Sequence, residues 1–151
     1  MVLLFYHIIN ISIPIKILFN SKIFAIFVIM KLFLDDNRKP YDVFKLTINP
    51  VYENNNWDIV KTYEDFTSYI EKNGIPEMIS FDHDLSFDHY YDENQKGELN
   101  YDEFKEKTGY HCAQWLIEYC KKNSLNLPTW FIHSANPVGS QNIKKLLTDF
   151  N

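Results

Sequence analysis

The sequence predicts an α/β domain with a parallel sheet covered by helices on both faces, and three observations lead to this class. Strand-like and helix-like patterns alternate along the chain from Met30 onward. The strand-like runs are short and continuously apolar, which is typical of strands buried on both faces. Three of the four runs stop at a polar cluster: DDNR, DHD or HSAN. Such alternation favours crossover connections between parallel strands.

Each predicted element has its own local signal. Thr62 and Asp65 have the spacing of a helix cap, and Gly74 is a residue type at which helices commonly end. Apolar residues from Thr108 onward recur at helical spacing, and the same spacing returns before the C-terminus. Residues 39–56 are polar and contain two prolines, so we expect a loop with one helical turn near 43–46. The predicted strands are 31–34, 57–60, 78–81 and 128–132.

Composition narrows the function classes. The chain has 151 residues, 46% hydrophobic and 23% charged, which fits one globular domain. Its formal net charge is −5 and no cluster of five Lys or Arg occurs, so we expect no binding of duplex nucleic acid. Cys112 and Cys120 are spaced along one predicted helix and should face inward rather than form a bridge. Without a disulfide framework, a cytoplasmic location is expected.

The first 29 residues differ from the rest of the chain. They contain no acidic residue, two lysines and Pro14, and Met30 stands directly before the first predicted strand. One interpretation is an over-extended start, with the protein beginning at Met30 and residues 1–29 dispensable. The alternatives are a membrane anchor, which would make the protein membrane-bound, and an additional packed element. The polar residues within 1–15 make a spanning helix a poor match.

Residues 86–107 form an acidic insertion between the third strand and the following helix. Its segment 92–103 resembles a calcium-binding loop, but Lys96 occupies a position that needs an oxygen ligand, and no helix precedes it. We therefore expect an acidic lid over the strand ends rather than a calcium site.

The polar clusters lie where this fold class places ligands, just beyond the carboxyl ends of the strands. Asp35, Asp36, Asp82 and Asp84 would bring carboxylates close together, and a cation would relieve their mutual repulsion. Oxygen ligands suit Mg²⁺ or Mn²⁺. Arg38 carries a planar guanidinium group suited to phosphate. The clusters therefore predict a divalent cation beside a phosphate ligand.

Two histidines end predicted strands. His83 and His133 could act as base and acid in the cleavage of a phosphoester, and a bell-shaped pH profile would follow. Ser134 and Asn136 offer hydroxyl and amide groups for phosphate oxygens, although turn formation before Pro137 would explain them equally well.

The segments KLFLDDNRKP, WDIVKTYEDF, ISFDHDL, TGYHCAQWL and HSANPVGSQNI together resemble the cyclic-phosphate processing receiver-like domain family. The resemblance covers 30–151. It implies a three-layer, receiver-like (flavodoxin-like) fold with four strands in the order 2-1-3-4, truncated before a fifth strand. That strand carries a lysine in a full receiver. Its loss, and a histidine at position 111 where an acid is expected, are departures from the pattern.

The resemblance also implies a function. Family members are thought to process cyclic phosphates, such as ADP-ribose 1″,2″-cyclic phosphate or a nucleoside cyclic phosphate, in RNA repair or NAD metabolism. We therefore expect a metal-assisted cyclic phosphodiesterase, with a small cyclic phosphate or nucleotide as its ligand. The alternatives are a binding module that sequesters a cyclic nucleotide, and a degenerate receiver phosphorylated on Asp82 or Asp84. The expected roles are metal binding by Asp35, Asp36, Asp82 and Asp84, phosphate binding by Arg38, Ser134 and Asn136, and catalysis by His83 and His133.

Overall fold

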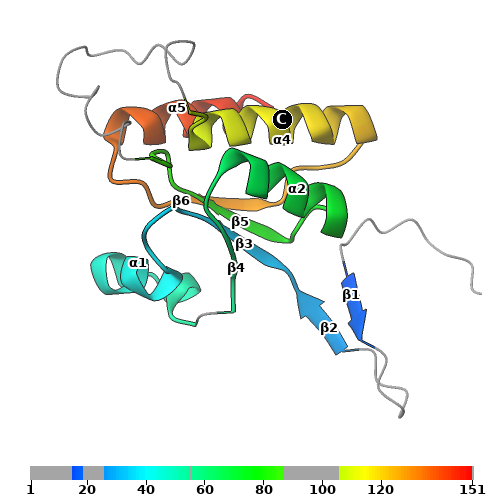
Figure 1. Ribbon diagram of the computed structural model, residues 1–151, viewed down its shortest axis with the longest axis horizontal. Coiled ribbons are helices and arrows are strands. Elements are labelled where there is room, and N and C mark those ends of the chain that lie inside the picture. The colour runs from blue at the N-terminus through cyan, green and yellow to red at the C-terminus, as the bar shows by residue number, and fades with distance from the viewer. Residues whose placement is uncertain (1–14, 19–25, 55, 87–105, 151) are drawn as a thin grey trace, which may run out of the picture.

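The structure is a computed structural model that describes residues 15–18, 26–54, 56–86 and 106–150. At its centre is a four-stranded parallel sheet in the order β4-β3-β5-β6, so the predicted order 2-1-3-4 is confirmed. Helices α2, α4 and α5 cover one face of this sheet and α1 lies on the other (Figure 1). The elements are β1 Ile15–Leu18, β2 Ile26–Ile29, β3 Lys31–Leu34, α1 Pro40–Thr47, η1 Pro50–Tyr52, β4 Asp58–Val60, α2 Tyr63–Asn73, β5 Met78–Phe81, α4 Gly109–Asn123, β6 Thr129–Ile132 and α5 Pro137–Thr148.

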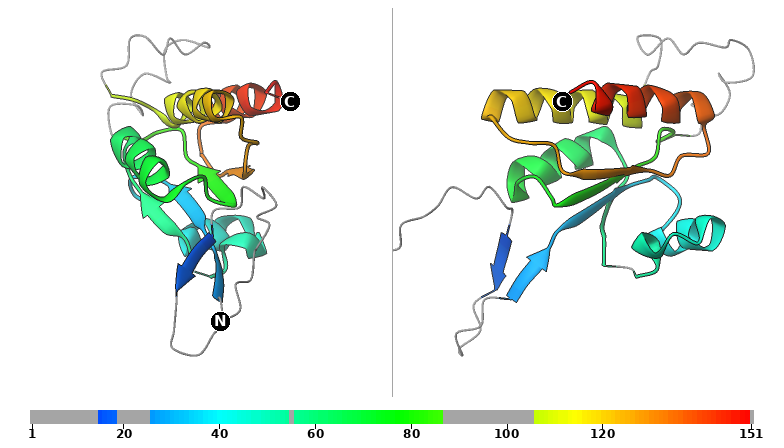
Figure 2. Two further views of the ribbon diagram at one scale, coloured as in Figure 1. Left: turned by 90° about the vertical axis from the view of Figure 1, so that its right-hand side faces the viewer. Right: turned by 180° about the vertical axis from the view of Figure 1, so that it is seen from behind.

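Successive residues of a strand point to opposite faces of the sheet and contribute to two different apolar clusters. Leu32 and Leu34 of β3 contribute to the larger cluster, under α2, α4 and α5. Phe33, between them, belongs to a smaller cluster with Val43, Tyr52 and Trp57, on the side of α1. All three β3 residues are fully buried. The period of two along a strand therefore produces the three-layer arrangement, which Figure 2 shows from two further directions.

Helix α1 is longer than the single turn expected from the sequence. Pro40 stands at its first position, where the missing N–H is harmless. The Asp42 side chain accepts a hydrogen bond from the Lys39 backbone N–H at 3.1 Å, and buried Val43 anchors the helix to the smaller cluster. Burial of Pro40 and Val43 in the folded protein thus stabilises a longer helix than the polar sequence around them favours by itself.

The predicted start and end of α2 and the predicted inward-facing cysteines are confirmed. Thr62 accepts a hydrogen bond from the backbone N–H of Asp65 at 3.1 Å, and α2 ends at Gly74, whose φ of 84° suits glycine. Cys112 and Cys120 are buried free thiols on α4. Strand β6 begins at Thr129, one residue later than predicted, because the preceding proline lacks the N–H that a ladder needs.

Two short strands precede the four-stranded sheet in the chain. Strands β1 and β2 pair with each other in antiparallel register. Residues 87–105 of the acidic insertion proposed as a lid, which include the segment that resembles a calcium-binding loop, lie outside the described residues. Within the described ranges, no helix has the length and apolar character needed to cross a membrane.

A variant that begins at Met30 is expected to fold and to unfold cooperatively. Met30 is itself buried, and the described members of both apolar clusters all follow it in the chain. Circular dichroism melting of this variant beside the full chain is the measurement. Loss of the cooperative transition would show that residues 1–29 contribute to the core.

Candidate functional site

The carboxyl ends of the strands meet at one edge of the sheet, as the sequence predicts. The backbone N–H of Asp35 donates to the last residue of β4 at 3.1 Å, and that of Asp82 to the last residue of β3 at 2.9 Å. The N–H of His133 donates to the last residue of β5 at 3.0 Å. These bonds continue the ladder one residue beyond each strand, so the polar clusters start from fixed backbone positions.

Three of the four predicted metal-binding acids come together. Asp35, Asp36 and Asp82 each offer a carboxylate oxygen, and these atoms lie within 4.8 Å of one another, which could hold a metal ion. Asp84 does not join them, because its Oδ1 atom lies 2.7 Å from Nδ1 of His83. We call Asp35, Asp36 and Asp82 the acid cluster.

Arg38 points into the acid cluster. Its Nε lies 2.8 Å from Oδ2 of Asp35, and its Nη2 lies 2.9 Å from Oδ2 of Asp82. Its Nη1 donates to the carbonyl of His133 at 3.2 Å. Arg38, which the sequence predicts to bind phosphate, thus uses most of its guanidinium group to neutralise two carboxylates.

The pKa values of the three acids respond differently to this environment. Burial raises the pKa of Asp36, and the charges of Asp35 and Asp82 raise it further. Burial also raises the pKa of Asp82, although the charge of Arg38 opposes this. For Asp35, burial acts in the same direction, but hydrogen bonds from His133 and two backbone amides outweigh it and lower the pKa. The cluster therefore holds one firmly ionised acid and two that a cation would help to ionise.

A buried chain of hydrogen bonds leads from the acid cluster into the smaller apolar cluster. His133 Nε2 lies 3.1 Å from Oδ2 of Asp35, and its Nδ1 lies 2.6 Å from Oγ of Ser80. The Ser80 hydroxyl lies 2.8 Å from that of Tyr52. The imidazole stacks on the Phe33 ring at 4.2 Å between centroids, and its side chain is 1% exposed.

The hydrogen-bond partners of His133 determine which of its two ring nitrogens carries the proton. Burial lowers the pKa of His133 despite the hydrogen bond to Asp35, so the ring is neutral near pH 7. Asp35 is ionised and can only accept, so Nε2 carries the proton and donates to it. Nδ1 then accepts from Ser80, whose oxygen accepts from Tyr52. His133 is thus a fixed donor that keeps Asp35 ionised.

The buried state of His133 predicts a pH dependence of stability. In the unfolded chain its pKa returns to about 6.5, above the folded value. Between the two values the unfolded chain binds a proton that the folded chain does not, so the free energy of unfolding falls as pH decreases below about 6.5. Urea unfolding at several pH values between 5 and 8 measures this. The slope should be smaller in His133→Gln, and an unchanged slope would contradict the assignment.

His83 belongs to a second network. Its Nδ1 lies 2.7 Å from Oδ1 of Asp84 and 3.1 Å from Nδ2 of Asn136, and its side chain is 1% exposed. The ring packs on α5 at Gly139, where an added Cβ would lie 2.2 Å from the His83 Cγ. Asn136 also caps α5, accepting from the Gly139 backbone N–H at 2.7 Å.

The structure places the two histidines on different faces of the sheet and does not bring their rings together. His133 contacts Phe33 and Tyr52 on the α1 side of the sheet, whereas His83 packs against α5 on the other side. Both rings are buried, each within its own network. The physical reason is that side chains alternate between the two faces along β6, and His133, the next residue, falls on the α1 face. His83 instead turns toward α5, the helix that follows β6.

The remaining predicted phosphate ligands divide between the two networks. Ser134 is half-buried, and the hydrogen bond from its hydroxyl to Asp82 opposes part of the rise in that acid's pKa that burial causes. It also accepts from the Asn136 backbone N–H at 3.1 Å. Asn136 is buried beside His83, which leaves Ser134 as the predicted neutral ligand at the acid cluster.

Several residues that build the site were not singled out by the sequence. Ser80 had a signal, because it is a polar residue in an apolar strand two positions before Asp82 and therefore on the same face. Tyr52 had none, since it lies in a segment expected to be loop. Gly109 and Gly139 had none either, because their role is to let α4 and α5 approach the backbone and ring of residues 82–83.

One of the three comparisons with known proteins gives a match. The family model described as cyclic-phosphate processing receiver domain matches residues 30–149, which is most of the chain. Searches of the curated proteins and of the solved structures returned no match. The matched range contains the whole four-stranded sheet and all residues of both networks. The chain belongs to the cyclic-phosphate processing receiver domain family.

Proposed function

We propose that this protein hydrolyses one ester bond of a small cyclic phosphate with the help of a divalent cation bound at the acid cluster. One observation carries the proposal. Asp36 Oδ1 is buried and has no hydrogen-bond partner among the described residues, although two further carboxylates lie beside it. A buried acceptor without a partner is costly, and a cation would satisfy it. The family name supports the substrate class.

The donor set fits Mg²⁺ or Mn²⁺, which prefer oxygen ligands. The three acids would not contribute equally. Asp35 Oδ1 accepts from the backbone N–H groups of Asn37 and Arg38 at 2.9 and 2.6 Å, and Oδ2 accepts from Arg38 and His133. We therefore assign the first ligand to Asp36, with Asp82 beside it and Asp35 as the anchor of Arg38.

The residues around the cation have different roles in this proposal. Bound there, the cation would stabilise charge on the phosphoryl group and lower the pKa of a bound water. Arg38 keeps Asp35 and Asp82 close together, and His133 keeps Asp35 ionised. Ser134, half-buried at the cluster, would turn its single hydroxyl proton from Asp82 to a phosphoryl oxygen when the substrate binds. In this proposal His83 and His133 position other groups rather than transfer protons to the substrate.

The test is incubation with a panel of cyclic phosphates followed by phosphorus NMR. The panel contains ADP-ribose 1″,2″-cyclic phosphate and the nucleoside 2′,3′- and 3′,5′-cyclic phosphates, each with Mg²⁺, with Mn²⁺ or with a chelator. Conversion of a cyclic diester to a monoester only when metal is present supports the proposal, and the substrate that reacts indicates a link to RNA repair or to NAD metabolism.

Two other outcomes are distinguishable in the same experiment. Line broadening of a cyclic phosphate without product indicates a binding module. Phosphorylation of the protein after incubation with acetyl phosphate, seen as added mass, indicates a phospho-acceptor receiver. The latter needs an open carboxylate, yet Asp82 and Asp84 are only 2% and 3% exposed. Both oxygens of Asp82 and Oδ1 of Asp84 already have partners.

A further inference from the structure

We propose that Lys61 binds the phosphate group of the substrate at this site, the role that the sequence suggests for Arg38. This inference rests on the proposed function, because it supposes that a phosphate approaches the acid cluster. It names a binding residue that neither the motifs nor the family description assigns.

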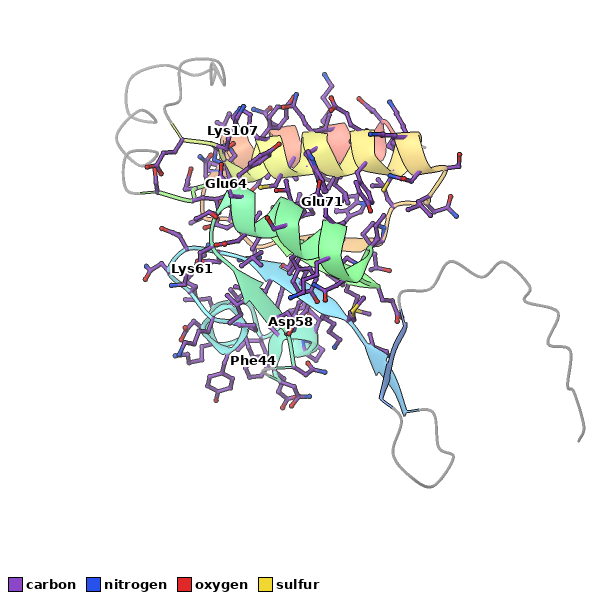
Figure 3. All side chains as sticks on the ribbon, turned by 45° about the vertical axis from the view of Figure 1, so that its right-hand side comes forward. Phe44, Asp58, Lys61, Glu64, Glu71 and Lys107 are labelled. Carbon is purple, nitrogen blue, oxygen red and sulfur yellow. The ribbon has the colours of Figure 1, made fainter. Side chains whose placement is uncertain are left out.

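The sheet register places Lys61 beside the acid cluster. Leu34 of β3 pairs with Val60 of β4, and the Val60 carbonyl accepts the backbone N–H of Asp35 at 3.1 Å. Lys61 and Asp35 are therefore the next neighbours across the same parallel pair. In Figure 3, Lys61 lies at the end of β4 that leads to α2, whereas Asp58 lies at the other end of that strand. The positive charge of Lys61 acts on the cluster, since it opposes part of the rise in the pKa of Asp36 that burial and the neighbouring acids cause.

The charges at the cluster require another cation before a phosphate can bind. Three carboxylates lie together, and Arg38 neutralises part of their charge through contacts to two of them. A divalent cation and Arg38 would at best balance the three acids. A phosphate anion would then meet a neutral site in partly exposed surroundings, and a further positive charge is needed to attract it. Lys61 supplies that charge from the rim of the cluster.

Lys61 is also available for a ligand. Its side chain is exposed and forms no ion pair with any described residue. Lys107, another lysine labelled in Figure 3, lies over the Tyr63 ring with 5.9 Å between its Nζ and the ring centroid. A flexible ammonium group on the rim can follow a phosphate that moves between substrate and product positions.

The experiment measures binding of inorganic phosphate by isothermal titration calorimetry in the presence of Mg²⁺. The proteins are the wild type, Lys61→Gln, Lys61→Arg and the control Lys72→Gln. Lys72 is an exposed lysine in the last turn of α2, at the opposite end of that helix, so its substitution makes the same change in net charge away from the acid cluster. Losing one charge-assisted hydrogen bond should weaken phosphate binding roughly 10- to 100-fold in Lys61→Gln.

Lys61→Arg should keep most of the affinity and Lys72→Gln should keep all of it. Melting temperatures should match in all four proteins, because both lysines are exposed surface residues. Equal phosphate affinity in the wild type and Lys61→Gln, or no phosphate binding by the wild type, overturns the assignment of Lys61. If phosphate binding depends on Lys61 but no cyclic phosphate is converted, the assignment of Lys61 stands and the proposed hydrolysis is rejected. Failure of the Lys61 assignment and failure of the proposed function therefore give different results.

Discussion

Asp36→Asn should abolish metal-dependent hydrolysis and at the same time make the folded protein more stable. The substitution removes a half-buried carboxylate whose pKa is raised by burial and by two neighbouring acids. Relief of this repulsion should add on the order of 1 kcal/mol to the free energy of unfolding. Loss of the proposed metal ligand should reduce the turnover rate by at least about 10²-fold. A substitution that lowers the turnover rate and raises the free energy of unfolding is typical of a residue that serves function at the expense of stability.

Urea unfolding and phosphorus NMR with and without Mg²⁺ measure the two effects. Asp149→Asn is the matched control, because it makes the same charge change at an exposed position at the end of α5. It should leave turnover and its metal dependence unchanged. If Asp36→Asn retains metal-dependent turnover, the ligand assignment is wrong. If it destabilises the protein, Asp36 has a structural partner that the proposal lacks.

Gly109→Ala is expected to be the most destabilising of the single substitutions considered for this fold. A Cβ at position 109 would lie 1.8 Å from the backbone oxygen of Asp82 and 3.2 Å from the His83 Cα. The backbone N–H of Gly109 also donates to the His83 carbonyl at 2.8 Å. These obstacles are backbone atoms, so α4 can accommodate the methyl group only by moving away from β5. We expect a loss of about 3 kcal/mol or more in the free energy of unfolding.

Because the same backbone carries Asp82, this displacement should also disturb the acid cluster. Folded Gly109→Ala protein should therefore bind Mn²⁺ more weakly than the wild type, which electron paramagnetic resonance can measure. The control is Gln114→Ala, an exposed position on the same helix where alanine is favourable. Equal stability of Gly109→Ala and Gln114→Ala would contradict the close approach of α4 to residues 82–83.

The sequence by itself determined the layout of the fold and the edge at which the site lies. Short apolar runs separated by helical stripes give a parallel sheet, and the carboxyl ends of parallel strands meet at one edge. For this reason Asp35, Asp82 and His133 could be predicted to converge before any side-chain contact was known. The cap at Thr62 and the end of α2 at Gly74 were also predictable, because both depend only on local backbone chemistry.

Only the tertiary structure decided how the functional groups pair. Sequence spacing does not tell whether Arg38 turns toward solvent or into the acids, since one of its two carboxylate partners, Asp82, follows a different strand. Nor does it tell that His83 and His133 enter different networks, because each ring follows the packing beyond its strand end. The partners that decided this, Ser80 for His133 and Gly139 for His83, come from other elements. Side chains from distant elements become partners only when the helices pack on the sheet. The alternation of strands and helices, and the edge at which the strands end, follow from the local sequence pattern.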